Sequence, residues 1–194
     1  ISLVRNPEHT DEVAGAGARA VVADLETISI AELAGHLEGA DAVVFAAGAG
    51  PDSGAERKDT VDRAGATLLA DAAVAAGVHR YLLVSATGVD ADPDPERGAV
   101  WAAYIKAKKA AEEAIRAMPE LAATILRPGL LTDDPGTGKV LLAPPPVERA
   151  EVTRDDTAAV LAALLEAPDT AGSTLELRGG DQDVTEAVAA RRQA

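Results

Sequence analysis

Residues 81–115 read YLLVSATGVDADPDPERGAVWAAYIKAKKAAEEAI. The apolar run from Tyr81 to Val84 passes through a polar loop into a helical pattern that begins near Val100. An apolar strand followed by an amphipathic helix is typical of the repeating unit of a parallel sheet covered by helices. This stretch therefore predicts an α/β fold.

The helix within this stretch carries Tyr104 and Lys108 at a spacing of four. Residues four apart share one face of a helix, so the phenol and the ammonium can reach the same bound molecule. At about 100° per residue, Lys108 falls inside the arc of an apolar stripe made by Val100, Tyr104, Ala107, Ala111, Ile115 and Met118. Such a lysine either extends its stem along apolar surface to water or acts as a cation that favours the phenolate of Tyr104.

The same alternation of strand and helix runs along the rest of the chain. Predicted strands are Ile1–Val4, Arg19–Val22, Asp41–Phe45, Tyr81–Val84 and Ala123–Leu126. Predicted helices are Pro7–Ala14, Ile28–Leu37, Thr60–Ala76 and Val100–Met118. A Pro-rich loop at Pro144–Pro146, a helix capped at Thr153, the strand STLELRGG and a short helix after Asp183 follow.

This order predicts a Rossmann-like, doubly wound, mostly parallel sheet with helices on both faces. We find no linker or repeat, so residues 1–194 are expected to form one domain. Residues of the central strands should be buried on both faces of the sheet. The residues expected to be buried in this way are Val43, Val44, Leu82, Leu83 and Ile125.

Composition excludes several classes of protein. A net charge of −14 and a pI near 4.5 argue against nucleic acid and anionic membrane surfaces as partners. The chain has no cysteine and only three scattered histidines, so no metal site is expected. With 47% hydrophobic residues, a mean hydropathy of +0.04 and neither a membrane span nor a signal peptide, the sequence predicts a cytoplasmic protein.

Seven phrases occur in an order that resembles the NAD(P)-binding short-chain dehydrogenase/reductase superfamily, most closely its atypical, epimerase-like branch. They are LVRNP, VVADL, DAVVFAAG, YLLVSATG, YIKAKKAAEEAI, TILRPGLLTDDPGTG and STLELRGGD. The resemblance covers Ile1 to about Asp183. It implies an NAD(P)-dependent oxidoreductase or epimerase that acts on an unknown small molecule.

One part of the family pattern is missing. Members begin with a strand, a glycine-rich turn and a helix that hold the pyrophosphate, whereas this chain opens at what resembles the second strand. Gly48 and Gly50 follow a later strand and do not fit the G-x-G-x-x-G spacing. The first strand, turn and helix are therefore expected to be absent, and a truncated, cofactor-free fragment is one alternative.

The resemblance assigns cofactor contacts by position. Arg5 corresponds to the arginine that meets the 2′-phosphate, which favours NADP over NAD; a solvated turn arginine is the alternative. Asp24 and Leu25 correspond to the pair beside the adenine, although Asp24 could simply cap a turn. The other expected contacts are Ala46, Ala47 and Gly48, where the nucleotide passes the backbone, and Pro128 and Gly129, which flank the nicotinamide or merely stop a strand.

The resemblance also assigns a reaction site. Ser85 would hold the substrate oxygen, with Thr87 as a rival, and Tyr104 would exchange a proton with it. Lys108 would bind the nicotinamide ribose and lower the pKa of Tyr104. Related reductases often place an asparagine where this chain has Asp62.

The substrate side reads as featureless. The loops Ala91–Gly98 and Pro135–Pro146 offer acids, glycine and proline, so no basic pocket suited to a sugar nucleotide is expected. The branch also includes proteins that sense NADPH without turnover, and a non-catalytic regulator is therefore a second alternative. Alanine-rich helix faces suggest a homodimer.

Overall fold

The protein is built around a six-stranded sheet. The computed structural model describes residues 1–50 and 52–192. The strand order is β10-β7-β9-β5-β4-β3, with β3, β4, β5 and β9 parallel and β7 antiparallel to its two neighbours. The bounds are Ala42–Phe45 (β3), Arg80–Val84 (β4), Ala122–Pro128 (β5), Lys139–Ala143 (β7), Thr174–Gly179 (β9) and Gln182–Asp183 (β10).

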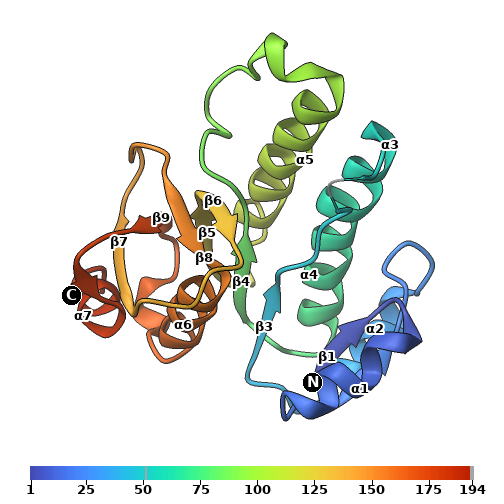
Figure 1. Cartoon of the computed structure of the whole chain (residues 1–194). Helices are drawn as coiled ribbons and strands as arrows, with labels where there is room; N and C mark the ends of the chain where they lie inside the picture. The colour runs from blue at the N-terminus through green and yellow to red at the C-terminus, as the bar shows by residue number, and fades with distance from the viewer. Residues whose placement is uncertain (51, 193–194) are drawn as a thin grey trace.

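Helices cover both faces of this sheet (Figure 1). On one face, α2 (Ile30–Leu37), α4 (Ala66–Ala75) and α5 (Gly98–Arg116) pack on β3, β4 and β5. On the other, α6 (Arg154–Leu165) and α7 (Val184–Ala189) pack on β5, β7 and β9. The predicted doubly wound, mostly parallel architecture is confirmed.

Two strand pairs lie outside the main sheet. One parallel pair is β1 (Ser2–Val4) with β2 (Ala20–Val22), linked by a 3₁₀ turn and α1 (Thr10–Gly15). The other is β6 (Leu130–Thr132) with β8 (Glu151–Thr153). Within the described residues no strand pairs with the outer edge of β3, so β3 ends the main sheet on the side of β1.

The predicted elements are largely confirmed. Each predicted strand is present with shifts of one or two residues at its ends, and the Thr153 side chain caps α6 by accepting from the Asp156 amide. Of the residues expected in the core, Val43, Leu82, Leu83 and Ile125 are buried. Val44 is only half-buried, because it lies on the edge strand β3.

Two regions differ from the predictions. The helix expected over Thr60–Ala76 starts earlier, as α3 (Ala55–Arg57) and a π-helical stretch (Lys58–Gly65) that continues into α4. Within the segment expected to be a loop, β7 forms an antiparallel strand. Its alternating burial is short and ends at prolines, so it is hard to distinguish from a turn by pattern.

A buried ion cluster fixes α5 to the sheet. The Arg127 side chain on β5 is 2% exposed and donates two hydrogen bonds to Glu112 on α5, at 2.8 and 2.7 Å. It also pairs with Asp90 in the loop before α5. Because a bidentate arginine–carboxylate pair is geometrically specific, the cluster sets the position of the helix that carries Tyr104 and Lys108.

Gly129 allows a close backbone approach beside this site. A Cβ atom at Gly129 would lie 1.9 Å from the Ala150 carbonyl oxygen. That carbonyl accepts from the Leu130 amide at 3.0 Å, which joins the start of β6 to the segment before β8. The absence of a side chain at Gly129 is therefore required by packing.

We expect Gly129→Ala to destabilise the protein by about 1–3 kcal/mol, because backbone must move to make room for the methyl group. The matched control is Gly35→Ala in α2, where a Cβ meets nothing within 4 Å and helix propensity should add up to about 1 kcal/mol. Urea unfolding of the two variants measures both changes. Equal free energies of unfolding for Gly129→Ala and Gly35→Ala would contradict the packing role assigned to Gly129.

Candidate functional site

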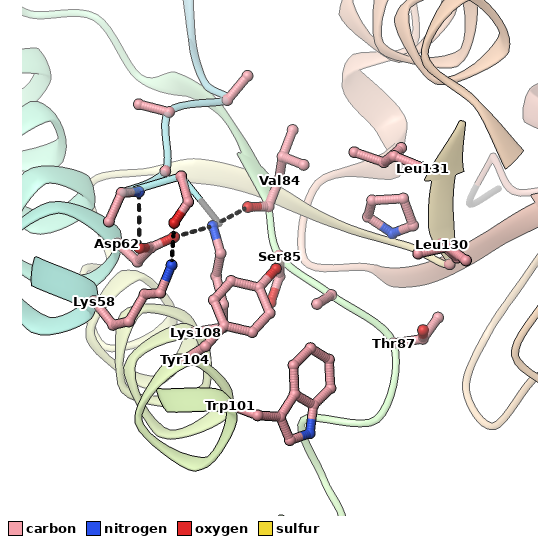
Figure 2. Close-up of a pocket in the computed structure, with 18 of the residues that line it drawn as sticks. Lys58, Asp62, Val84, Ser85, Thr87, Trp101, Tyr104, Lys108, Leu130 and Leu131 are labelled. Atoms are coloured by element: carbon pink, nitrogen blue, oxygen red, sulfur yellow. Dashed lines mark hydrogen bonds and ion pairs between the residues drawn. The ribbon is translucent and has the colours of Figure 1, made fainter. Parts of the chain in front are cut away.

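A cavity of about 710 Å³ opens at the carboxyl ends of β3 and β4. It lies between α5, the π-helical stretch and the segment after β5, and Figure 2 shows Ser85, Tyr104 and Lys108 facing it. Open α/β sheets bind ligands at this edge. The other predicted site residues that line it are Ala46, Ala47, Gly48, Pro128 and Gly129.

A smaller cavity of about 230 Å³ lies beside the ends of β1 and β2. Arg5, Asp24 and Leu25 line it, and Ala47 and Gly48 line both cavities. The predicted site residues thus fall into two adjoining groups along the carboxyl edge. An elongated ligand that passes the small residues after β3 could occupy both.

A buried ion pair forms the floor of the larger cavity. Lys108 Nζ lies 3.2 Å from Asp62 Oδ1, with side chains 5% and 1% exposed. Lys108 also donates to the Val84 carbonyl oxygen at 3.1 Å, and the Ala49 amide donates to Asp62 at 3.1 Å. Lys108 therefore does not extend to water. Burial lowers the pKa of Lys108, and the Asp62 carboxylate opposes that change.

Two ammonium groups lie near the Tyr104 ring. Its ring centroid lies 5.7 Å from Lys58 Nζ and 5.8 Å from Lys108 Nζ. Burial, followed by the negative charge of Asp62, raises the pKa of the Tyr104 phenol to about 12. The net shift is upward because burial and the Asp62 carboxylate both favour the phenol. That Lys108 lowers the pKa of Tyr104 stays a prediction.

Two buried hydroxyl groups in the cavity have no partner. Ser85 and Thr87 are 3% and 6% exposed, and neither side-chain oxygen forms a hydrogen bond with any described residue. Their backbone amides are held by the Leu126 and Pro128 carbonyls at 2.7 and 3.1 Å. An unsatisfied buried hydroxyl costs about 1–3 kcal/mol, which a ligand oxygen would relieve.

Sequence reasoning missed Lys58. It lies one turn before Asp62 on the π-helical stretch, is 6% exposed and donates to the Gly50 carbonyl at 2.5 Å. π-Helical turns often occur at functional sites. Hydrophobic periodicity read at 3.6 residues per turn cannot reveal them, and the sequence offered no other signal for Lys58.

The substrate side was expected to offer no basic pocket, but three arginines, Arg97, Arg149 and Arg154, line the larger cavity. Of these, only Arg97 lies in one of the loops, Ala91–Gly98 and Pro135–Pro146, on which that expectation was based. The other two flank β8, which the β6–β8 pairing brings to the carboxyl edge.

Arg5 in the smaller cavity shares its carboxylate with a second arginine. Its guanidinium lies 3.7 Å from Glu26, and Arg57 lies 2.5 Å from the same oxygen. Hydrogen bonding from Arg57 is the main cause that lowers the pKa of Glu26. Asp24 accepts from the Glu26 amide at 2.9 Å, so it forms the turn that was the alternative to a nucleotide contact.

Residues 1–50 and 52–192 contain neither a cluster of metal-ligating side chains nor a membrane-spanning helix. No group of three or more histidine, aspartate or glutamate residues in that part of the chain could hold a metal ion. Over the same residues, none of the helices has the length and apolar character that crossing a membrane would require.

Known proteins resemble this chain over nearly its whole length. The NAD(P)H-binding family profile matches residues 1–168. YhfK of Bacillus subtilis, described as an uncharacterized sugar epimerase, is 36% identical over 187 residues, or 96% of this chain and 85% of its own.

Two solved structures share the fold. One from Bacillus halodurans, named provisionally as an NAD-dependent epimerase/dehydratase, has 35% identity and a TM-score of 0.86 over 97% of this chain and 86% of its own. The oxidoreductase ylbE of Lactococcus lactis has 28% identity and a TM-score of 0.76, and the alignment covers 89% of this chain and 76% of the ylbE chain. With a Rossmann-like sheet and a nucleotide-sized groove at its carboxyl edge, this chain belongs to the NAD(P)H-binding family of atypical short-chain dehydrogenase/reductase-like proteins and is an NAD(P)-binding, oxidoreductase- or epimerase-like protein.

Proposed function

We propose that the protein is an NADP-dependent reductase of a carbonyl group, with Ser85 and Tyr104 acting on the carbonyl oxygen. The observation that carries the proposal is the buried, unpartnered Ser85 hydroxyl in the same cavity as a protonated Tyr104. A hydroxyl without a protein partner is available to a ligand oxygen, and a phenol kept protonated is available as an acid.

The residues present fit the two ends of a dinucleotide, although the described residues hold no counterpart of the glycine-rich turn that binds the pyrophosphate in family members. Ala46, Ala47 and Gly48 leave the backbone accessible where both cavities meet, and a Cβ on Gly48 would lie 3.1 Å from an Asp62 carboxylate oxygen. Arg5 and Leu25 would hold the adenosine end, and Pro128 would flank the nicotinamide. When bound, the nicotinamide supplies a hydride.

The protein side of the reaction is a proton transfer at one oxygen. Ser85 donates a hydrogen bond that orients the carbonyl oxygen, and Tyr104 gives its proton to that oxygen as negative charge develops there. The ammonium groups of Lys58 and Lys108, 5.7 and 5.8 Å from the Tyr104 ring centroid, would stabilise the tyrosinate left behind. Thr87 offers a second hydroxyl to a neighbouring substrate group.

Burial and the Asp62 charge raise the pKa of Tyr104 to about 12, so the phenol holds its proton at neutral pH. A reductase needs the acid form, which is the form that burial and Asp62 stabilise. An NADPH sensor would require neither the acid nor the open hydroxyls.

Replacing Tyr104 with Phe should reduce carbonyl-dependent NADPH oxidation by about 10²–10⁴-fold, because the proton donor is lost, and should leave NADPH affinity nearly unchanged. Thr67→Val is a hydroxyl control that should retain turnover, because the Thr67 hydroxyl on α4 donates to the Arg63 carbonyl and lines neither cavity. A panel of aldehydes and ketones followed by NADPH absorbance gives the rates. Unchanged activity in Tyr104→Phe would favour the sensor alternative.

Tyr104 should remain a neutral phenol from about pH 6 to about pH 10, since a pKa raised above its ordinary value near 10 keeps the proton bound throughout that range. Tyr81, the other tyrosine, is buried with its pKa also raised. Near-ultraviolet absorbance should therefore show tyrosinate only after unfolding. A folded Tyr81→Phe variant that forms tyrosinate near neutral pH would contradict the acid role.

We infer that NADP is preferred over NAD because Arg5 is 57% exposed and can leave Glu26 to meet a 2′-phosphate. Arg5→Ala should weaken NADPH binding by about 1.5–3 kcal/mol and leave NADH binding almost unchanged. Titration calorimetry with both dinucleotides measures the difference.

Glu26→Gln provides the opposing control for this preference. It removes the carboxylate that competes with the 2′-phosphate for Arg5 and Arg57, so it should strengthen NADPH binding without strengthening NADH binding. Equal affinities for the two dinucleotides in the wild type would reject the preference, as would an unchanged ratio in both variants.

A further inference from the structure

We propose that the substrate carries an anionic group, a carboxylate or a phosphate, which Arg97 and Arg149 bind at the mouth of the larger cavity, against the ring of Trp101. This inference rests on the reductase proposal because it names a part of that reaction's substrate. It defines a binding site that is separate from the groups acting on the carbonyl.

Trp101 joins the two arginines to the reaction site. The Arg97 guanidinium lies 3.5 Å from the Trp101 ring centroid, and that of Arg149 lies 5.3 Å from it. The Trp101 and Tyr104 rings are 5.4 Å apart. All four residues line the same cavity, so a small molecule can reach from the arginines to the phenol.

Neither guanidinium is neutralised within the protein. Arg97 and Arg149 form no ion pair and no side-chain hydrogen bond with any residue in 1–50 and 52–192. The third arginine of the cavity, Arg154, is paired with Asp133 at 2.7 Å. The chain has 32 acidic and only 18 basic residues, so carboxylate partners are abundant. Two neighbouring arginines that nevertheless lack such a partner are available to bind an anionic ligand.

The two arginines act on one another electrostatically. The pKa of Arg149 is lowered first by burial and then by the charge of Arg97, while Tyr104 acts in the opposite direction. An anion between the two guanidinium groups would relieve this repulsion and could accept paired hydrogen bonds from each planar fork.

The surfaces beyond the arginines favour an apolar or planar substrate body. Trp101 presents a half-buried ring, while Val100 and Leu130 in the cavity wall are 42% and 51% exposed. Ser85 and Thr87 provide the unpaired hydroxyls at the inner end. The substrate class that fits is a carbonyl compound with an apolar or aromatic body and an anionic end.

Binding without turnover tests the anion site. Benzoate and phenyl phosphate, each against uncharged benzamide, are titrated into the protein with calorimetry and with the fluorescence of Trp101, the sole tryptophan. The anion that binds more tightly identifies the anionic group of the substrate as a carboxylate or a phosphate. Arg97→Gln and Arg149→Gln should each weaken anion binding about tenfold or more, and leave benzamide unaffected.

Arg63→Gln is the matched control, because it removes an equal charge from an exposed arginine that is paired with Asp59 outside both cavities. It should leave anion binding unchanged. Arg97→Lys keeps the charge and loses the fork, so partial recovery is expected. Equal binding of anions and benzamide, or equal losses in Arg63→Gln and the cavity variants, would overturn the inference.

A kinetic comparison separates this inference from the reductase proposal. With NADPH, para-formylbenzoate should be reduced with a kcat/KM about tenfold or more above that of its methyl ester, and Arg97→Gln should remove the difference. If neither aldehyde is reduced while benzoate binding still depends on the arginines, the reductase proposal fails and the anion site stands. An ester reduced as well as the acid would count against the anion site.

Discussion

The buried pair of Lys108 and Asp62 is the constraint on which the site depends. It joins α5 to the π-helical stretch, and further hydrogen bonds tie it to β4 through the Val84 carbonyl and to the segment after β3 through the Ala49 amide. Removing one partner of such a pair would leave a buried charge uncompensated, which is strongly destabilising. The pair therefore holds together the four elements that surround the cavity.

The same pair determines the chemistry of Tyr104. An unpaired Lys108 would favour the phenolate, whereas the paired lysine leaves burial and the Asp62 charge to decide, and both favour the phenol. The Ser85 hydroxyl, buried without a partner, completes a site suited to donating a proton.

Charge is distributed unevenly over an acidic chain. Glu26 pairs with Arg5 and Arg57 in the smaller cavity, and Glu112 and Asp90 pair with Arg127 beneath α5. At the cavity mouth, by contrast, Arg97 and Arg149 remain unpaired within the described part of the chain. The negative net charge of the protein repels anionic ligands overall, whereas the two arginines attract them at the cavity mouth. Anions that approach the protein are therefore directed to that site.

The sequence alone determined the layers of the fold, because hydrophobic periodicity and capping residues such as Thr153 act over a few neighbours. It also placed Ser85 directly after β4, and Tyr104 and Lys108 on α5. Only the tertiary structure decided that Asp62 pairs with Lys108, that Lys58 lies beside Tyr104, and that Arg97 and Arg149 both lie over the Trp101 ring. These contacts join segments tens of residues apart, and their effects depend on burial and distance, which local patterns do not contain.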